Sequence, residues 1–284
     1  LRIKENMDVW RTVVQWSDDK LAEKIREDQI DILIDMSGNT AGDRLKVFAR
    51  HPAPVQITWI GYPGTTGIKA MDYILMENTV LPGKNINAQF TEKIIRIPRS
   101  YAFDVEEQLP DVTEAPCVNN NFITFGSFNR LNKINREVIA LWCEVLRKLP
   151  DSRLQMAGMP SDGAPDELLT WFKEEEISED RLYFYPRSGF VEYLKLHNQV
   201  DFCLDTFPYT GGTTTMHALW MGVPTLTLIG DTYPSAQGGA VNNRAGLSQY
   251  FIADSQAEFV AKALFLAENK DILKNMKYSL RAHM

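Results

Sequence analysis

The chain has 284 residues, of which 44% are hydrophobic and 24% are charged, and its formal net charge at pH 7 is −7. This length suits two ordinary domains or one large one, and the composition is typical of a soluble globular protein. The negative charge argues against a broad nucleic-acid-binding surface, which needs clustered Lys and Arg, but it does not exclude one local cationic pocket.

The sequence also argues against a membrane segment, a structural metal and a resident cofactor. It has no run of 18 apolar residues and no signal peptide. Its three cysteines lie in no C-x-x-C pattern, and its four histidines show no paired metal spacing. No dinucleotide fingerprint, P-loop or G-x-S-x-G elbow occurs. We therefore expect a protein of a reducing, cytoplasmic compartment with no metal and no cofactor.

In chain order, the first part begins with an amphipathic helix at residues 18–28, in which charges separate the apolar positions Leu21 and Ile25. Short strands are predicted at residues 31–36, 55–60, 72–76 and 94–97. Glycine-containing loops at 37–42 and 61–67 follow the first two strands. Residues 100–120 contain prolines and several acids, and we expect a linker there.

The second part alternates regularly between strands and helices. Strands are predicted at residues 123–128, 154–157, 182–185, 200–204, 225–229 and 250–253. Helices are predicted at residues 136–148, 166–175, 191–197, 214–221, 238–245, 256–268 and 270–282. This alternation predicts a parallel, doubly wound α/β sheet, whose ligands bind at the carboxyl ends of the strands.

One loop at such a strand end is rich in glycine and threonine. The strand at residues 200–204 ends in Asp205, and Gly211 and Gly212 then precede Thr213 and Thr214 at the start of a helix. Glycines let a ligand approach the backbone, and we expect the threonines to cap the helix, whose amino end suits a phosphate. The alternative is an ordinary capped helix without a ligand.

A cationic loop follows the first strand of the second part. It holds Asn129, Arg130 and Lys133, and its alternative interpretation is a solvated turn. Because the carboxyl ends of parallel strands share one sheet edge, the cationic loop and the glycine-threonine loop together predict a diphosphate site.

Three further polar residues have open roles. Asp205 could be catalytic, but a strand-end Asp that caps the next loop is the favoured interpretation. His197 is expected to be structural. His217 lies four residues after Thr213 and could face a ligand ribose, or it could belong to the core.

Five ordered blocks of this sequence form a recognisable set: Pro52–Gln56, Trp59–Gly67, Met71–Tyr73, Phe125–Asn129 with Lys133, and Leu204–Pro224. They resemble the catalytic region of the O-linked N-acetylglucosamine transferases, glycosyltransferase family 41, which includes the Spindly-type O-fucosyltransferases. The match runs from about residue 32 to residue 246. The resemblance implies a GT-B-like α/β fold with two Rossmann-like lobes built on parallel sheets, often preceded by tetratricopeptide repeats.

The resemblance also implies an activity. Family members transfer a sugar from a nucleotide donor to protein Ser or Thr, with inversion and without a metal. We expect transfer of N-acetylglucosamine from UDP-GlcNAc to a protein acceptor. The alternatives are O-fucosyl transfer from GDP-fucose, or a non-catalytic nucleotide-binding or interaction module, since no residue stands out as a general base.

The family's functional residues carry over where its motifs match. Lys133 matches the lysine that contacts the donor diphosphate, and it would be catalytic by stabilising the leaving group. Thr213 and Thr214 match the paired threonines of the phosphate-binding helix. Three residues match the first-lobe loop near the sugar: Gly61, Pro63 and Gly64.

Other positions depart from the animal enzymes. Arg130 stands where they have Gln, and Gly212 stands where they have His. His217 stands where they have an Asp that contacts the ribose, and Tyr193 replaces a His near the base. Each of these positions therefore offers the donor a different side chain from that of the animal enzymes.

The resemblance predicts a lobe boundary at residue 118, with an incomplete first lobe at 1–118 and a nucleotide-sugar-binding lobe at 119–284. The family's histidine-bearing opening of the first lobe is not found, and neither is its terminal helix. We therefore expect a catalytic region truncated at both ends, which transfers sugar poorly by itself.

Overall fold

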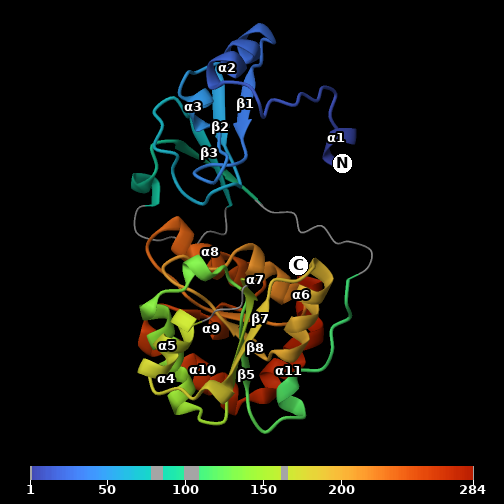
Figure 1. Ribbon diagram of the computed structural model, residues 1–284, viewed down its shortest axis with the longest axis vertical. Helices are drawn as coiled ribbons and strands as arrows, with labels where there is room; N and C mark the ends of the chain where they lie inside the picture. Colours follow the sequence, from blue (N-terminus) through green and yellow to red (C-terminus); the bar gives the residue numbers. More distant parts are fainter. Residues whose placement is uncertain (1, 78–85, 99–108, 161–165, 284) are drawn as a thin grey trace. The chain divides into compact units, whose positions relative to one another are not determined.

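The chain folds into two compact units in the computed structural model, which describes residues 2–77, 86–98, 109–160 and 166–283 (Figure 1). Residues 2–77 and 86–98 form the first unit, and residues 109–160 and 166–283 belong to the second. This division follows the contacts within each unit and does not test where the two lobes meet. The lobe boundary at residue 118 therefore stays a prediction.

The first unit contains a four-stranded parallel sheet in the order β1-β2-β3-β4. All four predicted strands are confirmed, whereas the short helix α3 has no counterpart in the sequence-based prediction. The elements of this unit are α1 (Arg2–Glu5), α2 (Asp18–Glu27), β1 (Ile32–Asp35), α3 (Leu45–Phe48), β2 (Val55–Thr58), β3 (Tyr73–Glu77), the 3-10 helix η1 (Ile86–Gln89) and β4 (Lys93–Ile97).

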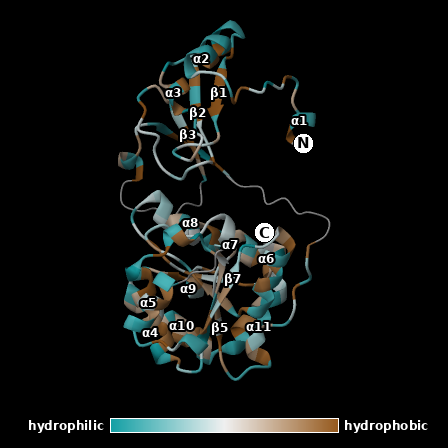
Figure 2. Cartoon of the chain, viewed as in Figure 1, coloured by the Kyte–Doolittle hydropathy of each residue, from teal (hydrophilic) through white to brown (hydrophobic). Residues whose placement is uncertain are grey.

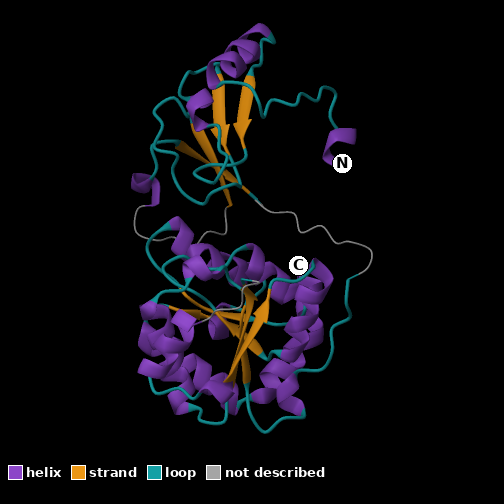
Figure 3. Ribbon diagram, in the orientation of Figure 1, coloured by secondary structure: helices purple, strands orange, loops and turns teal. Residues whose placement is uncertain are grey.

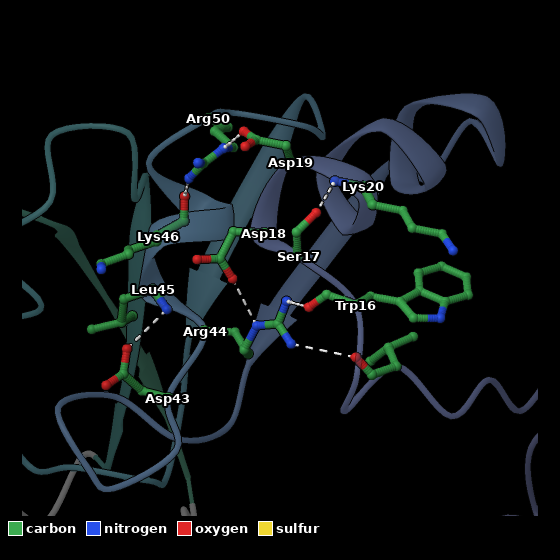
Figure 4. A network of polar contacts seen from close by, with 11 residues as sticks. Trp16, Ser17, Asp18, Asp19, Lys20, Asp43, Arg44, Leu45, Lys46 and Arg50 are labelled. Atoms are coloured by element: carbon green, nitrogen blue, oxygen red, sulfur yellow. Dashed lines mark hydrogen bonds and ion pairs between the residues drawn. The ribbon is translucent and has the colours of Figure 1, made fainter.

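A polar network fixes the start of α2 against α3 (Figure 4). Arg44 donates from Nε to Oδ1 of Asp18 at 2.9 Å and from Nη2 to the Trp16 carbonyl at 3.0 Å. Ser17 caps the helix, since its Oγ accepts from the Lys20 N–H at 3.2 Å. Partly exposed ion pairs contribute little stability, so we assign this network to the orientation of α2 rather than to the energy of folding.

The second unit contains a six-stranded parallel sheet in the order β10-β9-β8-β5-β6-β7, with helices on both sides (Figure 3). Counted from β5, this is the 3-2-1-4-5-6 order of the doubly wound fold, as the sequence predicts. The strands are β5 (Thr124–Ser127), β6 (Arg153–Met159), β7 (Leu182–Pro186), β8 (Phe202–Leu204), β9 (Thr225–Leu228) and β10 (Ile252–Ala253).

The seven predicted helices of the second unit are confirmed in place, α9 is a helix that the sequence did not predict, and two boundaries correct the prediction. Helix α8 begins at Tyr233, five residues before the predicted start, because Thr232 and Ser235 form a capping box there. Residues 250–251 belong to a helix and not to the last strand. The helices are α4 (Arg136–Lys148), α5 (Asp166–Glu174), α6 (Phe190–Leu196), α7 (Thr213–Trp220), α8 (Tyr233–Arg244), α9 (Ser248–Phe251), α10 (Gln256–Glu268) and α11 (Lys270–Ser279).

The core of the second unit is aromatic and aliphatic, and the helices turn hydrophilic residues outward (Figure 2). Trp142, Phe125 and Phe202 are fully buried, and the rings of the two phenylalanines meet edge to face at 5.0 Å. All three cysteines are free and buried, and burial raises the pKa of each thiol to about 12. None of the helices in the described ranges has the length and apolar character that crossing a membrane requires.

Candidate functional site

The strand order of the second sheet reverses between β5 and β8, and ligands of open α/β sheets bind at such a switch point. Asn129 lies two residues after β5 and donates from Nδ2 to Oδ1 of Asp205, which directly follows β8, at 3.0 Å. The Oδ1 of Asn129 accepts from Thr214 Oγ1, on α7, at 2.9 Å. One amide side chain therefore joins the three segments that meet at this edge.

Asp205 organises the loop that follows β8. The residue is 1% exposed, and its Oδ1 accepts from the N–H groups of Thr206 at 2.9 Å and Gly211 at 2.8 Å. Its Oδ2 accepts from Thr227 Oγ1 at 2.8 Å. Burial raises the pKa of the Asp205 carboxyl, while these donors and nearby Lys133 lower it. The interpretation of Asp205 as a residue that caps the next loop is confirmed.

The predicted threonine cap of α7 is wrong. The helix begins at Thr213, so the N-cap is Gly212, which has no side chain to cap it. Thr214 lies inside the first turn, and its hydroxyl donates to Asn129 instead. The first main-chain bond of the helix joins the Met216 N–H to the Gly212 carbonyl at 3.0 Å. The N–H groups of residues 213–215 thus lie at the open, partially positive end of α7, where an anion is stabilised.

Lys133 bridges the cationic loop and the glycine-threonine loop. It ends the 3-10 helix η3 (Leu131–Lys133), and its Nζ donates to the Thr210 carbonyl at 2.8 Å. The same Nζ lies 3.9 Å from the centroid of the Tyr209 ring. Burial lowers the pKa of Lys133, and the Asp205 carboxylate opposes that effect. The alternative interpretation of this loop as a solvated turn therefore does not hold for Lys133, whose side chain contacts Tyr209 and Thr210.

A pocket of 730 Å³ opens beside Asn129 at the carboxyl ends of β5, β6 and β7. Residues 128–132, 157–158 and 187 line it, and they include Arg130 and Arg187. Pockets of this volume hold ligands of nucleotide size. The sequence-based prediction missed Arg187, although it directly follows β7 as Asn129 and Arg130 follow β5. Arg187 could have been predicted from its position, because ligands of such sheets bind at the carboxyl ends of the strands.

His217 and Tyr193 belong to an aromatic cluster next to this pocket. The Nδ1 of His217 lies 3.2 Å from the Tyr193 hydroxyl, and burial lowers the pKa of His217 to about 4. Tyr193 also packs edge to face on Phe128 at 5.8 Å. His197 is fully buried and stacks on Phe128 at 3.8 Å, which confirms its structural role.

The three predicted residues of the first unit form a loop of their own after β2. Gly61 is held against the backbone of Met36 and Ser37, since an added Cβ would lie 2.5 Å or less from them. Pro63 is buried, and the Gly64 N–H donates to the Tyr62 carbonyl at 2.9 Å. The other predicted site residues all lie in the second unit, so a donor contact for this loop stays a prediction. Within the described ranges, no three His, Cys, Asp or Glu side chains gather as metal ligands would.

The two glycines before α7 are expected to differ sharply on replacement. An alanine Cβ at Gly211 would lie 2.4 Å from Thr215 Oγ1 and 3.2 Å from Asp205 Oδ1, whereas at Gly212 the nearest atom, from Gln237, is 3.4 Å away. Gly211→Ala should therefore cost about 1–3 kcal/mol of unfolding free energy, and Gly212→Ala much less. Urea unfolding of both variants measures this difference. Equal midpoints would show that the loop is not packed as described.

Comparisons with known proteins place these features in a family. The model of glycosyl transferase family 41 matches residues 6–120 and 113–283. The chain is 35% identical over 280 residues to the probable UDP-N-acetylglucosamine--peptide N-acetylglucosaminyltransferase SPINDLY of Hordeum vulgare, covering 97% of this chain and 29% of that protein. It is 31% identical over 291 residues to the corresponding SEC protein of Arabidopsis thaliana, covering 99% of this chain and 30% of that protein.

A solved structure is similar over nearly the whole chain. A mutant of Thermobaculum terrenum O-GlcNAc transferase superimposes with a TM-score of 0.91 at 34% identity, covering 99% of this chain and 54% of that one. The chain covers only 29% and 30% of the lengths of the two plant relatives named above. The match extends through both units and includes both strand-end loops.

Proposed function

The chain belongs to glycosyltransferase family 41, and on that premise we propose that its second unit binds a nucleotide sugar for transfer to protein Ser or Thr. UDP-N-acetylglucosamine is the donor that the names of the plant relatives favour. The observation that carries the proposal is the switch-point cluster, in which Asn129 and Lys133 hold two strand-end loops against the open end of α7.

The cluster suits a diphosphate because it offers donors and positive charge in one place. The N–H groups at the start of α7 can donate to phosphate oxygens. The Lys133 ammonium lies beside the Thr210 carbonyl, at the end of the same loop. The pocket beside Asn129 then supplies the room for a nucleoside.

The proposed chemistry follows from these contacts. Inverting transfer needs an acceptor hydroxyl aligned behind the anomeric carbon, and it leaves a nucleoside diphosphate whose negative charge grows in the transition state. Donors fixed before the reaction stabilise that charge without reorganisation. Lys133 and the start of α7 would perform this task without a metal, and the acceptor would be activated by a group that the switch-point cluster does not contain.

A GDP-linked sugar such as GDP-fucose is the second candidate donor, and the pocket favours it in one respect. Arg130 and Arg187 both line the pocket. The planar fork of an arginine pairs with two adjacent acceptors, as O6 and N7 of guanine provide. Uracil has no such adjacent pair. Direct comparison of UDP and GDP therefore separates the two candidates.

Calorimetric titration of UDP, GDP and their sugars into the wild type and Lys133→Met tests the diphosphate site. Methionine keeps an unbranched stem over Tyr209 and removes the charge, so nucleotide affinity should fall about 10- to 100-fold. Lys173→Met changes an exposed lysine of α5 and serves as the matched control. We expect its affinity to equal that of the wild type.

Two outcomes would contradict the proposal. Unchanged affinity in Lys133→Met, with a normal thermal unfolding midpoint, would remove the diphosphate assignment. Tight nucleotide binding without any sugar transfer to a Ser/Thr-rich peptide, in a chain extended to the relatives' full length, would instead identify a non-catalytic nucleotide-binding module.

A further inference from the structure

Tyr193, on α6, and His217, on α7, meet in a polar contact. The Tyr193 hydroxyl lies 3.2 Å from Nδ1 of His217, and the two ring centroids are 5.5 Å apart in an edge-to-face arrangement. Phe190, at the start of α6, also packs on His217, with the ring centroids 5.2 Å apart. The imidazole is therefore held in one orientation by rings from α6.

The protonation states of the two partners limit the directions that this hydrogen bond can take. Burial raises the pKa of Tyr193, so its hydroxyl keeps the proton, and burial lowers the pKa of His217 to about 4, so its imidazole is neutral at pH 7. A neutral imidazole has one N–H donor and one acceptor nitrogen. The Tyr193 hydroxyl therefore donates to Nδ1 if the imidazole carries its proton on Nε2, and accepts from Nδ1 in the other tautomer.

The position of His217 on α7 links this bond to the anion site. His217 lies four residues after Thr213 and three after Thr214, so it neighbours each of them on the surface of the helix. Helical side chains lean toward the amino end of the helix. The imidazole therefore extends toward the turn whose N–H groups are open.

We propose that Tyr193 is a positioning residue, whose hydroxyl donates to Nδ1 of His217 and thereby fixes the tautomer that carries its proton on Nε2. His217 then acts as a hydrogen-bond donor toward the nucleotide at the start of α7. The tautomer is a property of the free protein, whereas the contact with a nucleotide rests on the proposed function. The other tautomer would direct a lone pair toward an anionic or oxygen-rich ligand and would repel it.

The first test measures the tautomer without any ligand. Histidine labelled with ¹⁵N gives separate signals for protonated and unprotonated ring nitrogens, and the loss of one of the chain's four histidines in His217→Gln identifies the His217 signals. We expect a proton on Nε2 in the wild type and a mixture of tautomers in Tyr193→Phe. Tyr185→Phe is the matched control, because the Tyr185 hydroxyl donates to Gln199 instead. A proton on Nδ1 in the wild type, or an unchanged spectrum in Tyr193→Phe, would overturn the proposal.

The second test measures binding. Tyr193→Phe should weaken affinity for whichever of UDP and GDP the wild type binds by roughly three- to tenfold, the effect of one neutral hydrogen bond. Equal affinity in the wild type and Tyr193→Phe would overturn the positioning role. If the tautomer is as expected but the wild type binds neither nucleotide, the proposed function fails and the ligand half of this proposal fails with it.

Discussion

Asp205→Ala is expected to destabilise the second unit by about 3–5 kcal/mol and to abolish nucleotide binding at the switch point. The carboxylate accepts four hydrogen bonds, from Thr206, Gly211, Asn129 and Thr227, in a place that is 1% exposed to solvent. Alanine would leave all four donors buried without an acceptor. Each such loss costs about 1–3 kcal/mol unless the surroundings rearrange.

Asp205→Asn separates the role of the hydrogen bonds from that of the charge. The asparagine oxygen can replace Oδ1 for the two N–H groups and for Asn129. The Thr227 hydroxyl can turn and accept from the new amide. We therefore expect Asp205→Asn to lie within about 1 kcal/mol of the wild type in urea unfolding.

The outcome for the two variants decides between two accounts of this residue. A large loss in Asp205→Ala with a small loss in Asp205→Asn supports Asp205 as the acceptor that shapes the loop. Equal large losses in both would contradict that account, because they would show that the carboxylate charge matters and not the hydrogen bonds. The same two variants, titrated with nucleotide, report whether the loop must be intact for binding.

The sheet of the second unit could be predicted because each of its strands is a short apolar run followed by a turn. That pattern is local, and alternation with helices then gives a parallel sheet and a ligand edge. Asn129 and Asp205 were predictable as neighbours for the same reason, since both follow strands of one sheet. In the structure the two side chains are joined by a hydrogen bond of 3.0 Å.

The partners of individual side chains could not be predicted in the same way. The Thr214 hydroxyl has a local option, to cap α7, and a distant one, Asn129, and only the fold brings the distant acceptor within 2.9 Å. In the sequence, Lys133 looks like a solvated loop residue. In the structure its Nζ contacts the Tyr209 ring and the Thr210 carbonyl, which belong to the loop after β8. The pairing of Tyr193 with His217 depends likewise on how α6 lies beside α7.

Hydrogen bonds also anchor the carboxyl end of α7. Gly222 adopts the left-handed conformation at φ +69°, and its N–H donates to the Leu219 carbonyl, while the Val223 N–H donates to the Ala218 carbonyl. This is a Schellman motif, which favours glycine at this position. Arg281, beyond α11, also donates to the Trp220 carbonyl at 2.9 Å.

Gly222→Ala is expected to cost about 3–5 kcal/mol, from backbone strain together with steric overlap. An added Cβ would lie 1.9 Å from the main-chain carbonyl oxygen of Lys277 in α11, an atom that cannot move unless its helix does. Displacement of α7 against α11 would also shift the helix start that the proposed site uses. Nucleotide affinity should therefore fall together with the unfolding midpoint.

Gly246→Ala is the matched control for this prediction. Gly246 ends α8 in the same motif at φ +74°, with its N–H donating to Asn243 and the Leu247 N–H donating to Asn242. No atom lies within 4 Å of an added Cβ there, so only the left-handed strain of about 1–2 kcal/mol remains. The difference between the two variants in urea unfolding isolates the contact between α7 and α11. Equal losses would mean that α11 does not pack on Gly222, and the anchoring of α7 from its carboxyl end would have to be abandoned.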